Sequence, residues 1–205
     1  MLNKIALPTP PVPRPMIDER EIAALASRYG DPVRRSFQLP ADGHLALYRN
    51  RQDSDRRAEV VFAIQDADGR IWLQAKPNYP QYTVRLPSGG IHWDEEVEAA
   101  LRREVAEETG LAVQIKRFVG VIEYSFQYTD HHAVHCVPFA SHVFHVFCGQ
   151  HAPSLSSDDE TLAWHAVLPS QLLQVAADLR NLLGERRAWG QWRALVHELV
   201  YDVLT

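Results

Sequence analysis

Hydrophobic and polar positions in the middle of the chain follow a pattern that predicts two paired β-strands. Glu59–Gln65 and Arg70–Lys76 are rich in β-branched and aromatic residues. The segment Asp66–Gly69 between them has the composition of a tight hairpin turn. We therefore expect a β-hairpin over this region, ended by Pro77, which breaks the pattern.

Other short apolar runs predict further strands. Because Pro87–Gly90 is rich in turn-forming residues, it is expected to be a tight, permissive loop rather than part of a strand. The additional predicted strands are Leu45–Arg49, Tyr82–Leu86, Leu111–Tyr128, Ala140–Cys148 and Leu162–Val167.

Apolar residues at helical spacing predict four helices. The first covers Ile17–Tyr29, and the clearest is Glu95–Thr109, with Asp94 as its expected N-cap and Gly110 at the left-handed C-terminal position. A third helix is expected to begin at Pro169. The last apolar stripe predicts an amphipathic C-terminal helix over Trp189–Val203. Strands on both sides of a central helix, with helices later, predict an α/β (α+β) protein with a mixed sheet covered by helices.

Composition narrows the class of protein. The 205 residues are 46% hydrophobic and 23% charged, which is ordinary for a globular chain. No stretch reaches the ~18 apolar residues of a membrane span, so we expect no membrane partner. The two cysteines, Cys136 and Cys148, cannot form a disulfide framework, which favours a cytoplasmic location. A net charge of −5 argues against sequence-independent binding to a nucleic acid duplex.

The negative charge is concentrated in one segment. Residues 94–108 contain seven acids and two bases, and their local charge of −5 equals the formal charge of the whole chain. On a helical wheel Glu104 and Glu108 fall on the same stripe as Val97, where a core-facing helix presents apolar residues. Carboxylates three and four residues apart repel one another, and the helix dipole disfavours them in the last turn. Such local conflicts tend to mark functional sites.

A divalent cation resolves these conflicts. Carboxylates on one helix suit Mg²⁺, which completes its coordination shell with water and substrate phosphates. The alternative is that the glutamates form a solvated acidic face, as most charge runs do. The glycine-rich loop immediately before the helix and the placement of the acids on the apolar stripe favour the metal.

At this point the segment resembles a known family motif. Gly89-x5-Glu95-x7-Arg103-Glu104-Val105-x-Glu107-Glu108-x-Gly110-Leu111 is similar to a complete Nudix box, with every consensus position filled. The resemblance extends more loosely over residues 58–172. It implies the Nudix fold, an α/β/α sandwich with a mixed sheet, and a hydrolase that uses Mg²⁺ or Mn²⁺ to cleave a diphosphate linkage in a nucleoside diphosphate linked to another moiety.

The resemblance also implies roles for individual residues. Glu104, Glu107 and Glu108 correspond to the carboxylates that bind metal, and the carbonyl of Gly89 is a further candidate ligand. Arg103 would hold the acids in place. Glu95 would be the partner of Arg103 or a structural cap, and Gly110 would have a structural role in the box.

A hydrolase of this kind needs a base to take a proton from the attacking water. Glu104 is the first candidate. Glu160, in a predicted loop with Asp158 and Asp159, is the alternative base or an extra metal ligand. A solvated turn is the competing interpretation of this acidic trio.

The sequence offers several candidate contacts for the substrate, which we expect to be a small-molecule nucleotide or a nucleotide sugar. Arg85, Lys76 and Arg35 are candidate phosphate contacts. Trp93 could stack on a base or pack at the rim of the site. Tyr128 lies 17 residues after Leu111, a spacing that resembles the dinucleoside-polyphosphate branch of the family.

A group of histidines and cysteines lies between residues 131 and 151. A zinc site needs about four converging ligands. His142 and His145 point to opposite faces of an alternating strand, which argues against such a site. The group comprises His131, His132, His135, Cys136, His142, His145, Cys148 and His151.

These patterns divide the chain into four parts. We expect residues 1–16 to form a proline-rich flexible arm, residues 17–55 an N-terminal helix and strand extension, and residues 56–180 the domain that resembles the Nudix family. Residues 181–205 form a helix that packs on the domain or on the partner in a homodimer. A different class of function remains open: a catalytically retired Nudix domain that senses a nucleotide ligand.

Overall fold

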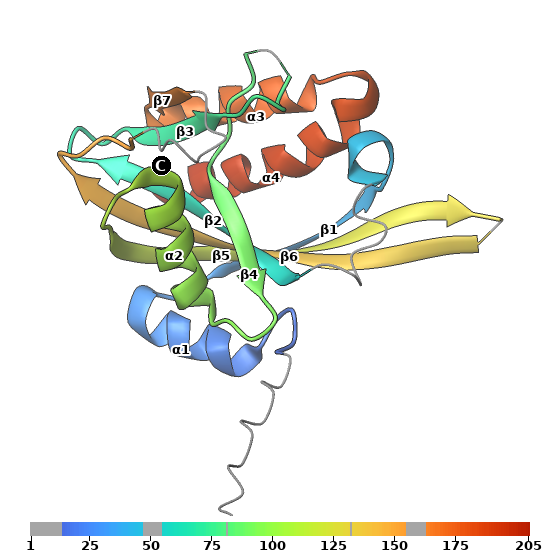
Figure 1. The fold of residues 1–205 in the computed structure, drawn as a ribbon, viewed down its shortest axis with the longest axis horizontal. Helices are drawn as coiled ribbons and strands as arrows, with labels where there is room; N and C mark the ends of the chain where they lie inside the picture. The colour runs from blue at the N-terminus through green and yellow to red at the C-terminus, as the bar shows by residue number, and fades with distance from the viewer. Residues whose placement is uncertain (1–13, 47–54, 81, 132, 155–162) are drawn as a thin grey trace, which may run out of the picture.

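The protein is described here by a computed structural model, which covers residues 14–46, 55–80, 82–131, 133–154 and 163–205 (Figure 1). The strands form one mixed sheet, and helices cover it. The helices are α1 (Glu19–Tyr29), α2 (Val97–Thr109), α3 (Leu172–Arg180) and α4 (Arg187–Leu204), with short 3-10 helices η2 (Pro169–Gln171) and η3 (Gly184–Arg186). The strands are β1 (Val33–Pro40), β2 (Arg56–Asp66), β3 (Ile71–Ala75), β4 (Ser88–His92), β5 (Gln114–Asp130), β6 (Ala133–Gly149) and β7 (Ala163–Val167).

The seven strands found in the described residues form a single mixed sheet. Its order is β1-β5-β6-β2-β3-β7, and β4 pairs with β2 beside this path. The pairs β1–β5 and β2–β6 are parallel, and the remaining pairs are antiparallel. The distal part of the β5–β6 hairpin extends beyond the body of the molecule (Figure 1).

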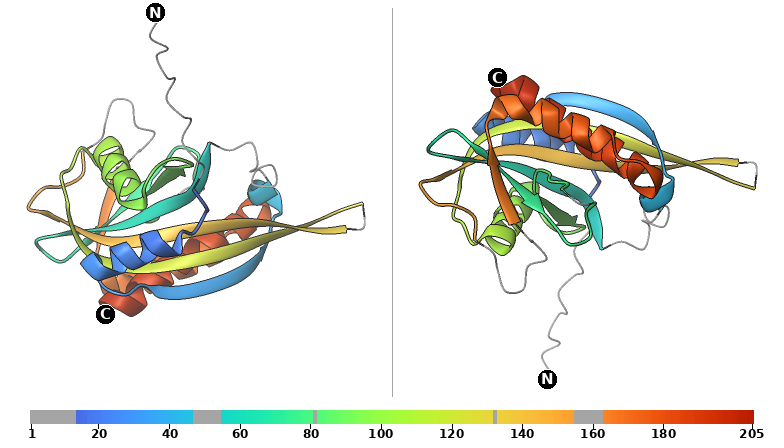
Figure 2. Two further views of the ribbon diagram at one scale, coloured as in Figure 1. Left: turned by 90° about the horizontal axis from the view of Figure 1, so that it is seen from below. Right: turned by 90° about the horizontal axis from the view of Figure 1, so that it is seen from above.

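Helices on both faces of the sheet complete an α/β/α sandwich, which confirms the expected fold. On one face, Leu25 of α1 and Leu101 of α2 belong to the same buried cluster as Phe62 of β2. On the other face, α3 and α4 pack on the sheet around Trp192, which is 1% exposed. Figure 2 shows α3 and α4 on the side of the sheet opposite α2.

The structure confirms the main predicted elements. The hairpin of β2 and β3, the strands β5, β6 and β7, and all four helices lie where the hydrophobic pattern places them. The C-terminal helix buries Trp189, Trp192, Leu199 and other apolar residues against the sheet of its own chain. In the described residues, no helix is long and apolar enough to pass through a lipid bilayer.

Several local predictions were wrong. Pro87–Gly90 is not a free loop, because Ser88–His92 forms the buried strand β4 and pairs with β2. Residues 43–46 form a 3-10 turn instead of the start of a strand, and the rest of Leu45–Arg49 lies outside the described residues. In Tyr82–Leu86 the structure shows an isolated bridge between Gln74 and Arg85 instead of a strand. The edge strand β1 was not predicted, because its side chains are largely exposed or half-buried and its sequence carries little apolar signal.

The start of the central helix also differs from the prediction. Helix α2 begins at Val97, with Glu96 at the cap position and no side-chain cap hydrogen bond from it, so Asp94 is not the N-cap. The backbone N–H of Val97 instead donates to Oε1 of Glu21 in α1, at 2.6 Å. A carboxylate from a helix 76 residues away therefore satisfies this helix end, which spacing along the chain cannot reveal. Gly110 ends α2 in the left-handed conformation, with φ of 68°.

Candidate active site

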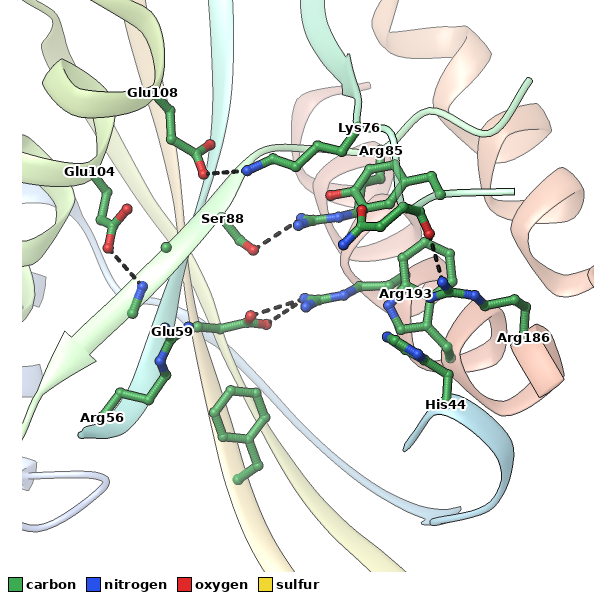
Figure 3. A pocket seen from close by; sticks show the side chains of 16 residues that line it. His44, Arg56, Glu59, Lys76, Arg85, Ser88, Glu104, Glu108, Arg186 and Arg193 are labelled. Atoms are coloured by element: carbon green, nitrogen blue, oxygen red, sulfur yellow. Dashed lines mark hydrogen bonds and ion pairs between the residues drawn. The ribbon is translucent and has the colours of Figure 1, made fainter. Parts of the chain in front are cut away.

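A cavity of about 350 Å³ opens between α2, the strands β2 and β4, and the N-terminal part of α4 (Figure 3). One wall, which we call the acidic wall, comes from α2 and β4 and carries Glu104, Glu108 and Gly89. The other wall comes from α4 and the segments that contact it. The cavity is lined by His44, Arg56, Glu59, Lys76, Asn78, Tyr79, Arg85, Ser88, Gly89, Gly90, Glu104, Glu108, Phe139, Arg186, Trp189 and Arg193.

Helix α2 and strand β4 place Glu104 against the backbone of the two glycines. The backbone N–H of Gly90 donates to Oε1 of Glu104 at 2.8 Å. A Cβ atom added to Gly89 would lie 1.8 Å from Cδ and 2.0 Å from Oε2 of Glu104. Only glycine at position 89 therefore lets the carboxylate approach the strand this closely.

Arg103 connects the acids around Glu104. Its guanidinium donates to Oε1 of Glu104 at 2.8 Å and to Oε2 of Glu107 at 3.0 Å. It also donates to both carboxylate oxygens of Glu95, at 2.9 and 2.8 Å, and to the carbonyl of Gly90 at 2.9 Å. The hydrogen bond with Glu95 is the main cause that raises the pKa of Arg103, against a smaller effect of burial. Arg103 thus fixes α2 to β4 and neutralises part of the acidic cluster.

Glu95 lies in the turn before α2 and has a structural environment. Burial acts to raise the pKa of its carboxyl, but the hydrogen bonds from Arg103 and from the backbone N–H of His92 outweigh burial and lower it. Glu95 does not line the cavity. It acts on the site through Arg103.

Glu108 is the most buried acid of the cavity wall that α2 provides. Its side chain is 12% exposed, and Oε1 pairs with Nζ of Lys76 at 3.0 Å. Burial is the main cause that raises the pKa of this carboxyl, while Lys76 and Arg85 act against it. Its other oxygen, Oε2, is buried without a hydrogen-bond partner among the described residues. A buried carboxylate oxygen without a partner is a position that an incoming cation can satisfy.

The three box acids do not converge on one point. Glu107 is 58% exposed on its side chain, bonds to Arg103 and does not line the cavity. In the part of the chain that the structure describes, no group of three His, Cys, Asp or Glu side chains is arranged to hold a metal ion. Two acids, Glu104 and Glu108, do share the cavity (Figure 3). Gly89 also lines it.

An unpredicted ion pair crosses the floor of the cavity. Nη1 of Arg193, on α4, lies 2.9 Å from both carboxylate oxygens of Glu59, on β2. The two side chains are only 7% and 6% exposed. Ser141 donates to Glu59 from the neighbouring strand at 2.6 Å. This pair ties the C-terminal helix to the centre of the sheet at the site itself.

His197, one turn further along α4, holds the loop that leads into β4. Its Nε2 accepts from the backbone N–H of Leu86 at 3.0 Å. Its Nδ1 lies 2.8 Å from the carbonyl of Arg193, so Nδ1 carries the hydrogen in the neutral ring. Burial lowers the pKa of His197 to about 3.

The sequence contained a signal for these missed residues. Glu59 lies in an otherwise apolar strand, and Arg193 and His197 lie on the apolar stripe of α4. The same conflict that singled out Glu104 and Glu108 therefore also marks these positions. Arg56, Arg186 and His44 also line the cavity, and for them we find no comparable signal.

Two of the three predicted phosphate contacts line the cavity, and the other predicted substrate contacts do not. Lys76 and Arg85 line it, whereas Arg35 pairs with Asp202 on another surface at 2.5 Å. Trp93 is 37% exposed and does not line the cavity. Tyr128 stacks on His135 in the extended hairpin, with ring centroids 5.0 Å apart. Glu160, Asp158 and Asp159 lie outside the described residues.

The two central histidines of the group at 131–151 have separate environments. His145 lies 2.9 Å from Oε1 of Gln65, and burial lowers its pKa to about 4. His142 is 1% exposed, and burial lowers its pKa to about 3. Both rings are therefore neutral near pH 7.

Comparison with known proteins gives one match to a family model. The model of the NUDIX domain matches residues 55–186, which include β2 to η3 and the complete motif around α2. It ends before α4, the helix that supplies Trp189 and Arg193 to the cavity.

Individual relatives either match a smaller part of the chain or have a lower sequence identity. Two RNA pyrophosphohydrolases from strains of Caulobacter vibrioides are 40% identical over 73 residues, which are 34% of this chain and 42% of each relative. The chain thus matches about two fifths of the length of these curated relatives. The structure of the E. coli dihydroneopterin triphosphate pyrophosphohydrolase is 17% identical, with a TM-score of 0.46, over 70% of this chain and 94% of that one. A MutT NUDIX hydrolase from Burkholderia pseudomallei is 22% identical, with a TM-score of 0.43, over 70% and 96%.

Proposed function

Because this chain belongs to the NUDIX domain family, we propose that it is a metal-dependent hydrolase that cleaves the diphosphate linkage in a nucleoside diphosphate linked to another moiety. The observation that carries the proposal is the cavity itself. Two box carboxylates, Glu104 and Glu108, line one wall, and four arginines and one lysine are among the residues that line the rest. Acids alone would repel a diphosphate, so the arrangement suits an anionic substrate with a divalent cation between it and the acids.

The residues of the acidic wall fit a divalent cation. Glu108 offers its unpartnered buried oxygen, and Glu104 lies over the strand at Gly89, whose carbonyl is the third proposed ligand. Oxygen ligands of this kind favour Mg²⁺ or Mn²⁺. Such an ion, when bound, neutralises phosphate oxygens and lowers the pKa of a coordinated water. Glu107 would join the ligands only by leaving Arg103.

The remaining box residues orient this wall. Arg103 holds Glu104 in place and keeps its position through Glu95. Glu104 is our first candidate for the base that takes the proton from the attacking water, and Glu160 is the alternative. Lys76 and Arg85 face the substrate phosphates from the cavity, whereas Trp93 and Tyr128 would need substrate groups that extend beyond it.

The names of the relatives narrow the chemistry only in part. The Caulobacter proteins are RNA pyrophosphohydrolases, but they match this chain over 42% of their length. We propose a small-molecule nucleotide as the substrate. We also propose a cytoplasmic site of action, from the two cysteines that form no disulfide.

One observation favours the second candidate function, a catalytically retired domain that senses a nucleotide. Lys76 already neutralises Glu108, one of the two acids that would hold the metal. In a sensor this ion pair would be permanent, and the wall that carries Arg85, Arg186 and Arg193, which we call the basic wall, would bind the ligand without turnover. In a hydrolase Lys76 would release Glu108 to a bound cation and would turn toward the substrate phosphates.

Metal titration separates the two candidates. We expect wild-type protein to bind Mn²⁺ and to release phosphate or a mononucleotide from at least one compound of a nucleotide panel. Glu104→Gln and Glu108→Gln should each reduce turnover by about a hundredfold or more and weaken Mn²⁺ binding. Glu123→Gln, which changes an exposed carboxylate on β5, is the matched control and should leave both unchanged. Equal Mn²⁺ binding by all four proteins, with no turnover, would contradict the hydrolase and support the sensor.

A further inference from the structure

The cavity carries more positive than negative charge. Burial is the main cause that lowers the pKa of His44, so this side chain counts as neutral. The lining residues therefore leave an excess of two positive charges, which one divalent cation would raise to four. The cationic lining residues are Arg56, Lys76, Arg85, Arg186 and Arg193, and the acidic ones are Glu59, Glu104 and Glu108.

Arg85 is a buried cation whose hydrogen bonds go to neutral groups. The residue is 7% exposed. Its Nη1 donates to the carbonyl of Leu86 at 2.7 Å and to Oγ of Ser88 at 2.9 Å. Among the described residues it forms no ion pair, and its buried Nε has no hydrogen-bond partner. Neutral acceptors satisfy N–H groups but do not balance the charge, and the nearby acid, Glu108, is already paired with Lys76, so a further anion would stabilise this buried guanidinium.

Two aromatic rings that contact each other connect Arg186 with Arg85 on the same wall. Arg85 lies over the ring of Tyr79 at 5.1 Å, and Arg186 lies over the ring of Trp189 at 5.6 Å. The two rings contact each other, with centroids 5.3 Å apart. Trp189 is only 4% exposed, so this stack offers a ligand its charges rather than an open aromatic face. Arg186 donates to the carbonyl of Asn78 at 2.6 Å, again a neutral acceptor.

The hydroxyl of Tyr79 is a third polar group on this wall. The hydroxyl of Tyr79 is buried and has no hydrogen-bond partner among the described residues. A phenolic O–H and two guanidinium groups are donors that suit the oxygens of a phosphate. Buried donors without acceptors are rare in native proteins and call for a ligand or an ordered water.

We propose that Arg85, Arg186 and Tyr79 form a second anion subsite, which binds a phosphate group beyond the cleaved linkage. The substrate is then a nucleotide with three or more phosphates in a row, rather than a nucleotide sugar whose second moiety is uncharged. This inference rests on the proposed function, which places the cleaved diphosphate at Glu104 and Glu108. A terminal phosphate carries about 1.5 to 2 negative charges at neutral pH, so a triphosphate carries about 3.5 to 4 and matches the charge of the cavity with one divalent ion.

Inorganic tripolyphosphate and pyrophosphate test the subsite, because they differ by one phosphate. Their dissociation constants are measured by calorimetry on the full chain with saturating Ca²⁺, a hard cation that oxygen ligands also hold, at fixed ionic strength, and phosphate release is assayed afterwards to verify that both anions stay intact. We expect wild-type protein to bind tripolyphosphate at least tenfold more tightly than pyrophosphate. Arg186→Gln should lose most of this ratio, and Tyr79→Phe should lose part of it. Arg187→Gln removes the same charge one residue further on, outside the cavity, and should keep the ratio.

Each outcome bears on the proposal. A wild-type ratio near one, or no measurable binding of tripolyphosphate, overturns the subsite. An equal ratio in Arg186→Gln and Arg187→Gln would show that general charge and not this wall selects the longer anion, and also overturns it. Thermal melts confirm that each variant is folded. If the ratio behaves as expected but no nucleotide is hydrolysed with Mg²⁺ or Mn²⁺, the subsite stands and the proposed hydrolase fails.

Discussion

The two walls of the cavity are built in different ways. The acidic wall comes from one helix and the strand next to it, with Glu104 and Glu108 four residues apart and Gly89 only 15 residues before Glu104. The basic wall joins segments that are far apart in the chain, because Arg85 precedes β4 and Arg186 and Arg193 lie about 100 residues later. In the sequence, both walls contain charged residues within apolar stretches, such as Glu104 in α2 and Arg193 in α4. Only the acidic wall is contiguous enough to form a recognisable motif.

The walls also differ in how their charges are balanced. Each cavity-lining acid of α2 has a cationic partner, Arg103 for Glu104 and Lys76 for Glu108. On the basic wall Arg193 is paired with Glu59, whereas Arg85 and Arg186 bond to neutral oxygens. The acidic wall is therefore held in place by the protein, whereas the basic wall would be completed by the phosphate that we propose.

The largest expected effect is on the acidic wall. In Gly89→Ala the new Cβ would overlap Glu104, so the side chain must move by an ångström or more. We expect turnover to fall at least a hundredfold, with a loss of about 2 kcal/mol in the free energy of unfolding. Steady-state kinetics and urea unfolding measure both. Gly149→Ala, where a Cβ meets open space at φ of 67°, is the control and should cost about 1 kcal/mol without loss of turnover. Full activity of Gly89→Ala would contradict the close approach.

The second prediction concerns the ion pair under the basic wall. Arg193→Met leaves the carboxylate of Glu59 buried without its cation, and we expect the free energy of unfolding to fall by about 3 kcal/mol. The double variant Glu59→Gln and Arg193→Met should recover most of this loss. Arg180→Met breaks an exposed pair with Glu198 and should cost about 0.5 kcal/mol. If the double variant were less stable than the single one, the buried pair would not be the cause.

The third prediction is a pH dependence of the loop beside the basic wall. Burial lowers the pKa of His197 to about 3 in the folded state, whereas the unfolded chain binds the proton near pH 6.5. Stability must therefore fall as the pH drops below 6.5, by about 2 kcal/mol at pH 5 from this residue. Gln at position 197 can accept from the N–H of Leu86 through Oε1 without titrating. Urea unfolding at pH 7.5 and pH 5.0 should show a smaller pH effect in His197→Gln, and an equal effect in both proteins would count against this assignment.

The smallest expected effect tests whether charge type alone identifies a phosphate contact. Arg35 has the chemistry of Arg85, but it pairs with Asp202 on an exposed surface. Arg35→Ala should change stability by about 0.5 kcal/mol or less and leave the kinetic constants within experimental error. A clear rise in KM would mean that the substrate reaches beyond the cavity to β1.

The sequence by itself determined the elements and the acidic wall. The apolar periods of α2, α4 and the β2–β3 hairpin predict those elements because each depends on neighbours a few residues away. Glu104, Glu108 and Gly89 could be singled out for the same reason, since one helix and one tight connection bring them together. Where a local signal was present but its partner was distant, as for the N–H of Val97 and Glu21, the prediction chose the wrong residue.

Only the tertiary structure decided how the second wall is made. Arg85 reaches the cavity because its backbone pairs with Gln74 at the end of β3. Arg193 meets Glu59 because Glu59 lies on the face of the sheet that α4 covers. No spacing along the chain encodes these contacts, since they depend on the packing of helices and strands far apart in sequence. The pattern of residues thus singled out two of the acids that line the cavity, and the folded chain shows the cationic groups on its other wall.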